Sequence, residues 1–159
     1  MTPSDVELVD FPRKIVAAAA LIFDDRGRLL IVKPTYRDGW NMPGGVVDAN
    51  ESPASACHRE LLEELALDLA VGRLLALDWR PDRGQGDSLQ FIFEGVTLTS
   101  TQLAQLRVPE DEISEYRFLP VEEAIATLPE RMRPRVAAAV RSLERGVPIY
   151  LESGIELGD

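Results

Sequence analysis

Short apolar runs separated by polar turns dominate the first third of the chain. The nine residues 15–23 are all apolar, but they include four consecutive alanines, which favour a helix locally, so this run alone fits a strand or a helix. Residues 24–27 read Asp-Asp-Arg-Gly, which is typical of a turn, and a second aliphatic run follows at 29–32. We therefore predict that the two runs form a β-hairpin.

Three further strands are predicted from short segments rich in apolar residues. They cover residues 73–80, 88–98 and 114–119, and the second of them alternates through Leu89, Phe91 and Phe93. Residues 81–87 contain two glycines and are expected to form the loop between the first two of these strands.

Three helices are predicted between and after these strands. The first begins with Ser52 as N-cap and Pro53 at its first position, and the second runs from Pro120 to residue 128. The third ends at Gly146 and carries one apolar stripe: Met132, Val136, Val140 and Leu143. Because strands and helices interleave without a repeat or a low-complexity linker, we predict one α/β or α+β domain over residues 1–159.

Charge narrows the classes of partner. The chain of 159 residues is 45% hydrophobic and has a formal net charge of −10. An acidic surface disfavours duplex nucleic acid and anionic membranes, because phosphate groups are neutralised by Lys and Arg. It still permits a small phosphate-bearing substrate if divalent cations bridge the substrate to acidic side chains.

Cellular location is predicted from what the sequence lacks. Cys57 is the only cysteine, so no intramolecular disulfide can form. Residues 1–14 do not have the basic and then apolar layout of a signal peptide, and the longest apolar run has nine residues, too few to span a bilayer. We therefore expect a cytoplasmic protein.

The segment 45–67 carries the candidate chemistry. Its helix contains Glu60, Glu63 and Glu64, and the spacing i, i+3, i+4 places the three carboxylates within an arc of roughly 100°. A separate apolar stripe on the same helix is predicted to be buried: Ala54, Cys57, Leu61 and Leu65. The acidic arc is either a solvated helix face or a site for hard divalent cations such as Mg²⁺, which take oxygen ligands from carboxylates and substrate phosphates.

The wider pattern decides between these alternatives, since it resembles the Nudix box. That box reads Gly-x5-Glu-x7-Arg-Glu-U-x-Glu-Glu-x-Gly-U, where U is aliphatic, and eight of its nine defined positions are matched here. The matching residues are Gly45, Glu51, Arg59, Glu60, Leu61, Glu63, Glu64 and Leu67.

The resemblance implies a fold and a set of roles. Nudix proteins have a mixed β-sheet sandwiched between helices, and they use Mg²⁺, or alternatively Mn²⁺. By position in the box, Glu60 and Glu64 are expected to bind metal, and Glu63 to share metal or activate water. The Gly45 carbonyl is a further expected ligand. Glu51 and Arg59 are expected to brace the loop against the helix through a charge-assisted hydrogen bond.

Two positions depart from the family pattern. Ala66 stands where the box has its last glycine, and if the helix ends there in the left-handed conformation, alanine costs about 1 kcal/mol. Asn50 stands where glycine is common, but Asn tolerates positive φ well. Neither departure removes a carboxylate.

Acids and arginines outside the box are weaker candidates. Residues 110–112 are three consecutive acids before a strand, where relatives often supply another metal ligand, so Glu110 and then Glu112 are candidates, with a solvated acidic turn as the alternative. Arg131, Arg133 and Arg135 could reach a substrate phosphate, but a solvated helix start is favoured.

The resemblance implies a hydrolase that cleaves a phosphoanhydride bond in a nucleoside diphosphate linked to another moiety. Pro81, fourteen residues after Leu67, favours ADP-ribose or a similar compound, although a turn proline explains it too. A house-cleaning pyrophosphatase for nucleoside triphosphates and a catalytically idle ligand-binding module are the alternatives. Homodimers are frequent among relatives, and the sequence leaves the oligomeric state open.

Overall fold

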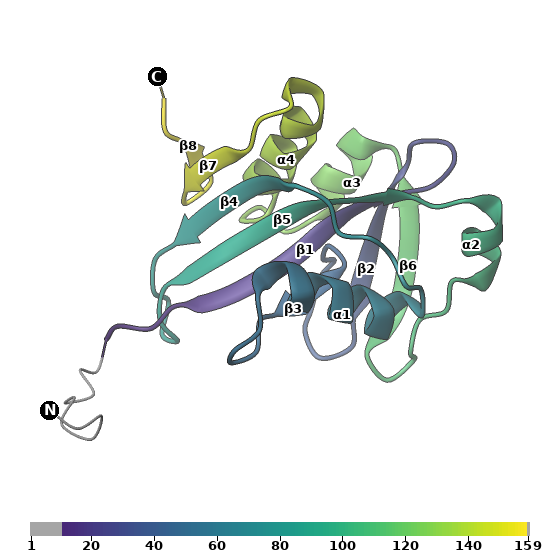
Figure 1. The fold of residues 1–159 in the computed structure, drawn as a ribbon, viewed down its shortest axis with the longest axis horizontal. Coiled ribbons are helices and arrows are strands. Elements are labelled where there is room, and N and C mark those ends of the chain that lie inside the picture. The colour runs from purple at the N-terminus through teal and green to yellow at the C-terminus, as the bar shows by residue number, and fades with distance from the viewer. Residues whose placement is uncertain (1–10, 159) are drawn as a thin grey trace, which may run out of the picture.

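A single mixed β-sheet organises the computed structural model, which describes residues 11–158 (Figure 1). Seven strands follow the order β6-β2-β1-β5-β4-β7-β8, and β3 pairs with β1 beside this path. The strands are β1 (Ile15–Phe23), β2 (Leu29–Pro34), β3 (Gly44–Val46), β4 (Leu74–Arg80), β5 (Ser88–Thr97), β6 (Ile113–Leu119), β7 (Ile149–Glu152) and β8 (Ile155–Glu156). The helices are α1 (Pro53–Leu65), α2 (Ser100–Gln105), α3 (Val121–Thr127) and α4 (Arg133–Arg145).

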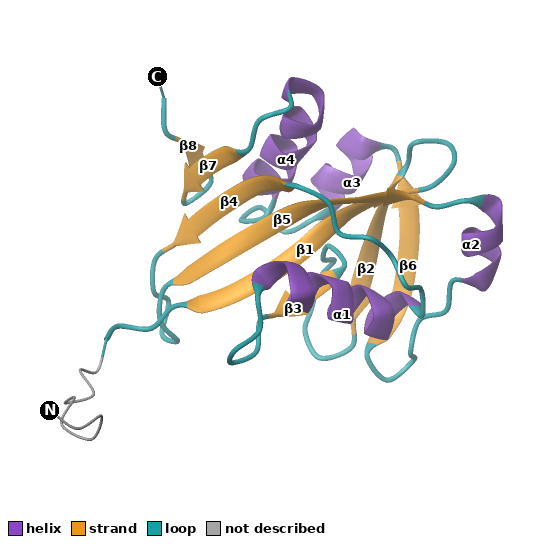
Figure 2. Ribbon diagram, in the orientation of Figure 1, coloured by secondary structure: helices purple, strands orange, loops and turns teal. Residues whose placement is uncertain are grey.

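The sheet separates two hydrophobic layers, because neighbouring residues of a strand point to opposite faces. In β1, Leu21 packs with residues of α3 and α4, whereas Ala20 and Ile22 pack with residues of α1. Strand β2 divides in the same way, with Leu29 and Ile31 on the α4 side and Leu30 and Val32 on the α1 side. The fold is therefore α+β, with helices on both faces of a mixed sheet, as predicted (Figure 2).

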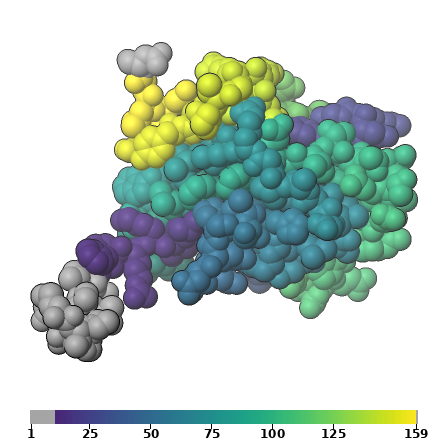
Figure 3. Space-filling model, viewed as in Figure 1, coloured from purple at the N-terminus to yellow at the C-terminus, as the bar shows by residue number. Residues whose placement is uncertain are grey.

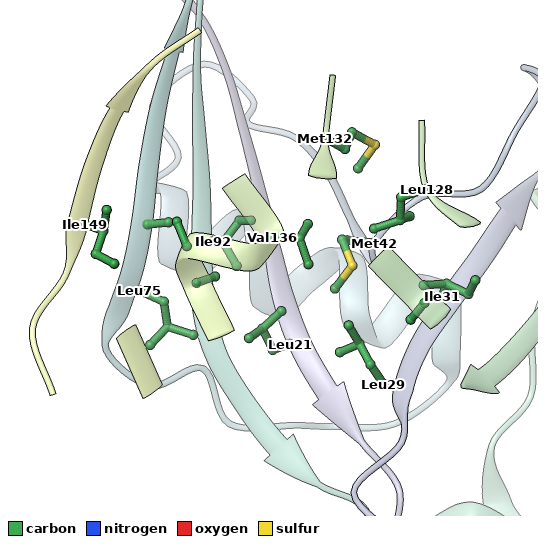
Figure 4. Packing of buried hydrophobic residues seen from close by; sticks show 14 of the residues in the cluster. Leu21, Leu29, Ile31, Met42, Leu75, Ile92, Leu128, Met132, Val136 and Ile149 are labelled. Atoms are coloured by element: carbon green, nitrogen blue, oxygen red, sulfur yellow. The ribbon is translucent and has the colours of Figure 1, made fainter. Parts of the chain in front are cut away.

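The α4 side of the core is built from aliphatic and methionine side chains. Val136 of α4 is fully buried and lies among Leu21, Ile92 and Met42 (Figure 4). On the other face, α1 crosses the middle of the molecule, as the space-filling view shows (Figure 3). None of the described helices is long and apolar enough to cross a membrane.

The predicted hairpin is confirmed, and its turn is held by one side chain. Strands β1 and β2 are antiparallel, with Phe23 opposite Leu29. The buried Asp24 carboxylate accepts hydrogen bonds from the backbone N–H groups of Arg26 and Arg28 and from Arg28 Nε. The alanine run is a strand rather than a helix because β1 pairs with β2, β3 and β5.

Several features differ from the predictions. Helix α2 and strands β3, β7 and β8 were not predicted, and residues 1–10, most of the segment without a signal-peptide pattern, lie outside the described residues. In α1, the predicted Ala54 is exposed and Ala56 is buried instead. The buried face of the helix is therefore made of Ala56, Cys57, Leu61, Glu64 and Leu65. In α4, Ala138, Ala139 and Ser142 are more deeply buried than Val140 and Leu143.

Candidate active site

Helix α1 begins and ends where the sequence predicts. The Ser52 side chain accepts a hydrogen bond from the Ser55 backbone N–H, and Pro53 occupies the first helical position. At the other end, Ala66 is left-handed with φ 56°, and its N–H donates to the Leu62 carbonyl. Cys57 is buried in the sheet-facing side, and burial raises the pKa of its thiol to about 12. With this side packed on the sheet, Glu60 and Glu64 of the helix lie toward β3.

Glu64 is the most deeply buried acid of this helix. Its side chain accepts a hydrogen bond of 3.1 Å from the backbone N–H of Gly44, and the residue is only 5% exposed. Burial, and then the charges of Glu60 and Glu112, raise the pKa of Glu64 to about 8. The alternative of a solvated acidic helix face therefore does not hold for Glu64, because β3 covers it.

Glu60 lies directly against the next residue of β3. A Cβ placed on Gly45 would come within 2.4 Å of the Glu60 carboxyl carbon and Oε1, so only glycine leaves room for this carboxylate. Burial raises the pKa of Glu60, and the charges of Glu63 and Glu112 raise it further against the lowering effect of Arg59. Gly44 has φ 147°, and a Cβ there would meet the Ala18 carbonyl oxygen.

Arg59 ties the preceding loop to the helix. Its Nε and one terminal nitrogen donate to the two Glu51 oxygens at 2.8 and 2.9 Å, a bidentate pair. That hydrogen bonding lowers the pKa of Glu51 to about 2. The same guanidinium donates to Glu60 at 2.9 Å and to Glu63 at 3.3 Å.

The acidic turn before β6 faces the helix carboxylates through one of its acids. The charge of Glu112 raises the pKa of both Glu60 and Glu64, whereas Glu110 has no such effect on either, and both of these turn acids are exposed. The turn is fastened to the end of β2, since the Thr35 backbone N–H donates to the Glu112 carbonyl at 2.9 Å. Glu63 is about half exposed at the rim of the cluster.

These residues fit a divalent cation in part. Within residues 11–158, no three acidic, histidine or cysteine side chains are arranged to hold a metal ion by themselves. Mg²⁺ commonly takes only one or two carboxylates from the protein and its other ligands from water and substrate phosphates. Two partly buried carboxyl groups beside glycine backbone supply hard oxygen donors for such a cation, which would displace the proton that burial favours on them.

A cleft of about 450 Å³ opens from Gly44 and Gly45 across the sheet. Its floor includes the half-buried Ala17 and Ala19 of β1, whose small side chains leave the space open. The lining also includes the aromatic residues Tyr36 and Phe91 and the polar residues Arg37, Asn41, Ser88 and Gln90. One signal for this cleft was overlooked in the sequence, namely alanines where a core strand normally carries larger aliphatic residues.

One of the three arginines near the start of α4 is buried, although a solvated helix start was the favoured expectation for all three. Arg131 is exposed and Arg133 Nε donates to the Leu128 carbonyl, but Arg135 is buried at 7% exposure against Asp78 of β4. A solvated helix start is therefore wrong for Arg135. Its partner lies 57 residues earlier in the chain, so local sequence gives no indication of the pair.

The remaining candidates have structural partners. His58 of α1 is half-buried, and its Nε2 lies 2.6 Å from Asp68. Trp79 Nε1 donates to Asp87 at 2.9 Å, and the Arg117 guanidinium lies over the Trp40 ring at 4.8 Å.

A protein-family model and curated relatives match this chain over most of its length. The NUDIX domain model matches residues 13–143. A MutT-like protein from Streptomyces ambofaciens is 28% identical over 110 residues, which cover 65% of this chain and 70% of that protein. A CMP-5'-(N-acetyl-N-hydroxy-3-aminopropyl)phosphonate hydrolase from Streptomyces rubellomurinus is 32% identical over 127 residues, which cover 74% of this chain and 57% of that protein.

The fold has close counterparts among solved structures. The MutT protein from Methanosarcina mazei Go1 aligns with a TM-score of 0.71 at 21% identity, covering 84% of this chain and 97% of that one.

The chain spans only 30% to 41% of the length of other curated relatives, RNA pyrophosphohydrolases among them.

Proposed function

The chain belongs to the Nudix family, and on that premise we propose that it is a divalent-metal-dependent hydrolase of a nucleoside diphosphate joined to a second group. One observation carries the proposal. The buried Glu64 and the partly buried Glu60 meet the backbone of Gly44 and Gly45, and these two glycines also line the large cleft. Negative charge is thus concentrated where the diphosphate of a bound substrate would lie.

The roles follow from these positions. Glu60 and Glu64, with the Gly45 carbonyl, would hold Mg²⁺ or Mn²⁺, and Glu112 and Glu63 would complete the acidic surroundings. When bound, the cation would neutralise the diphosphate and make water more acidic. Arg59 would keep Glu60 and Glu63 in place through its contact with Glu51, so its role is positioning.

The cleft suits a nucleotide-like substrate. Its volume of about 450 Å³ lies within the range of small-molecule sites. Tyr36 offers an aromatic face for a base or sugar, and Asn41 and Gln90 offer amide groups for hydrogen bonds. The relative from Streptomyces rubellomurinus, by its name, acts on a cytidine nucleotide joined to a phosphonate, which supports a substrate with a second moiety beyond the nucleotide.

Hydrolysis of a substrate panel tests the proposal. ADP-ribose, a nucleotide sugar and the nucleoside triphosphates would be incubated with Mg²⁺, with Mn²⁺ and with EDTA, and released phosphate or monophosphate measured. We expect activity on a diphosphate derivative, no activity in EDTA, and a loss of about 100-fold or more in kcat for Glu60→Gln and for Glu64→Gln.

The exposed Glu144 of α4 provides a matched control, and Glu144→Gln should retain wild-type turnover. Hydrolysis confined to nucleoside triphosphates would favour the house-cleaning alternative. Binding of nucleotides without hydrolysis of any would favour a ligand-binding module and would overturn the proposed activity.

A further inference from the structure

The end of the cleft away from Gly44 and Gly45 is lined by arginines. They come from three parts of the chain that are separate in sequence, namely the end of β4, the loop before β5 and the start of α4. A second, more open hollow of about 570 Å³ shares three of them with the cleft and includes Glu130 and Ser153. The four arginines are Arg80, Arg83, Arg131 and Arg135.

Arg135 is an incompletely partnered buried side chain in this group. Its Nε lies 3.1 Å from Asp78 Oδ2, yet the two atoms are not aligned for a hydrogen bond, and both are buried without any hydrogen-bond partner. The other Asp78 oxygen accepts the Gly154 backbone N–H at 2.9 Å. Arg135 is therefore fixed at this end of the cleft by an ion pair with Asp78 rather than by a well-aligned hydrogen bond.

The positive charge here exceeds what the neighbouring acids neutralise. Asp78 is shared between Arg135 and Arg80, whose terminal nitrogen lies 3.9 Å from the same oxygen. Burial, and then repulsion from Arg80 and Arg131, lower the pKa of Arg135 to about 10, while Asp78 opposes this. Among the residues that line this end, the four arginines stand against one acid, Glu130; Asp78 lies beneath Arg135, and Asp82 and Asp87 accept hydrogen bonds from Gly86 and Trp79 instead.

We propose that this arginine end is a subsite for a second phosphate group, carried by the substrate at a position remote from the anhydride that is cleaved. The inference rests on the proposed function, since it assumes that the diphosphate lies at Gly44 and Gly45. Guanidinium groups bind phosphate through paired N–H donors, and a dianion would neutralise the excess charge. The preferred substrate is therefore a nucleoside diphosphate derivative with an added phosphomonoester.

The added phosphate could sit on the nucleoside or on the second moiety, and matched substrates distinguish these positions. The probes are ADP-ribose, ADP-ribose phosphorylated on the adenosine 2′-hydroxyl, and ADP-ribose phosphorylated on the terminal ribose. We expect one phosphorylated probe to have a kcat/KM at least tenfold above that of ADP-ribose, chiefly through a lower KM. Equal values for all three probes would overturn the inference.

Arginine variants connect such a preference to this end of the cleft. Arg131→Gln and Arg83→Gln should each reduce the ratio of kcat/KM between the preferred phosphorylated probe and ADP-ribose by about fivefold to tenfold. Arg145→Gln, at the exposed far end of α4, should leave that ratio unchanged. A preference that survives in both cleft variants would place the second phosphate elsewhere and overturn the assignment.

Binding measurements separate failure of the inference from failure of the proposed function. Calorimetric titration of the same three probes in EDTA needs no turnover, and the phosphorylated probe should bind at least tenfold more tightly. If no probe is hydrolysed but this difference in Kd remains and is lost in Arg131→Gln, the subsite stands without the activity. If all three probes bind equally, the subsite is wrong whatever is hydrolysed.

Discussion

Ala66 holds a left-handed conformation at the end of α1, where a residue with a Cβ is strained. Its φ is 56°, and the sequence resemblance predicts glycine at this position. Ala66→Gly should therefore stabilise the protein by about 0.5–1 kcal/mol, measured by urea unfolding. Ala104→Gly, at an exposed right-handed position of α2, should destabilise by a similar amount. Equal effects of the two substitutions would contradict the strain at Ala66.

Glu64 should make the metal-free protein less stable as pH rises. Its pKa is raised from 4.5 to about 8, so the folded state binds a proton more tightly than the unfolded state does. The stabilising contribution is complete below about pH 4.5 and is lost as pH rises through 8, on the order of a few kcal/mol. In EDTA, Glu64→Gln should melt higher than wild type at pH 8, and the difference should shrink toward pH 5.

The comparison needs a second acid as reference. Glu144→Gln removes an exposed glutamate from α4, so its melting temperature should follow that of wild type across the same pH range. Part of the pH dependence of the melting temperature should remain in Glu64→Gln, because the pKa of Glu60 is also raised. Parallel curves for wild type and Glu64→Gln would show that burial does not act on Glu64 as described.

Single residues were predictable where their conformation or chemistry is encoded locally. Glycine at the matching family positions made positive φ an open possibility at Asn50 and Ala66, and both residues are left-handed in the structure. The burial of Arg135 was not predictable, because it depends on Asp78, which only the docking of α4 on β4 brings close. The covering of Glu64 likewise depends on the approach of β3, not on helical spacing.

At the scale of elements, β3 and α1 form one unit through a glycine contact. Gly45→Ala would place a Cβ 2.4 Å from the Glu60 carboxylate, so that carboxylate must move. We expect turnover to fall by about tenfold or more while the melting temperature changes by only a few degrees, since Glu60 is at the edge of the core. Val147→Ala, at an exposed valine that follows α4 and does not line the cleft, is the control and should keep normal turnover. Normal turnover of Gly45→Ala would exclude Glu60 from the site.

Elements were predicted well where apolar periodicity is strong and missed where long-range pairing makes them. The hairpin, α1 and α4 have clear patterns and end signals, and their places are confirmed. Strands β7 and β8 have four and two residues, and four of these six are exposed or polar. Strand β7 forms because it pairs in parallel with β4. Helix α2 has six residues and none is buried, so its capping box at Thr99 and Gln102 is its main local signal.

At the scale of the whole molecule, charge is distributed in two opposed regions along one cleft. The carboxylates of α1 lie behind the glycine end, and the arginines lie at the other end, within a chain of net charge −10. This arrangement separates two effects of ions on stability. Any salt screens the general repulsion between acidic groups, whereas only a divalent cation bound at Glu60 and Glu64 stabilises the folded state specifically.

Melting temperatures at matched ionic strength should reveal the specific effect. Mg²⁺ at tenfold its Kd stabilises the folded state by about 1.4 kcal/mol, which corresponds to roughly 3–5 °C for a domain of this size. Wild type should therefore melt higher in MgCl₂ than in NaCl of equal ionic strength, and Glu144→Gln should behave like wild type. In the Glu60→Gln, Glu64→Gln double variant the two salts should give the same melting temperature. An Mg²⁺ effect that persists in the double variant would mean that the cation binds elsewhere on this acidic surface.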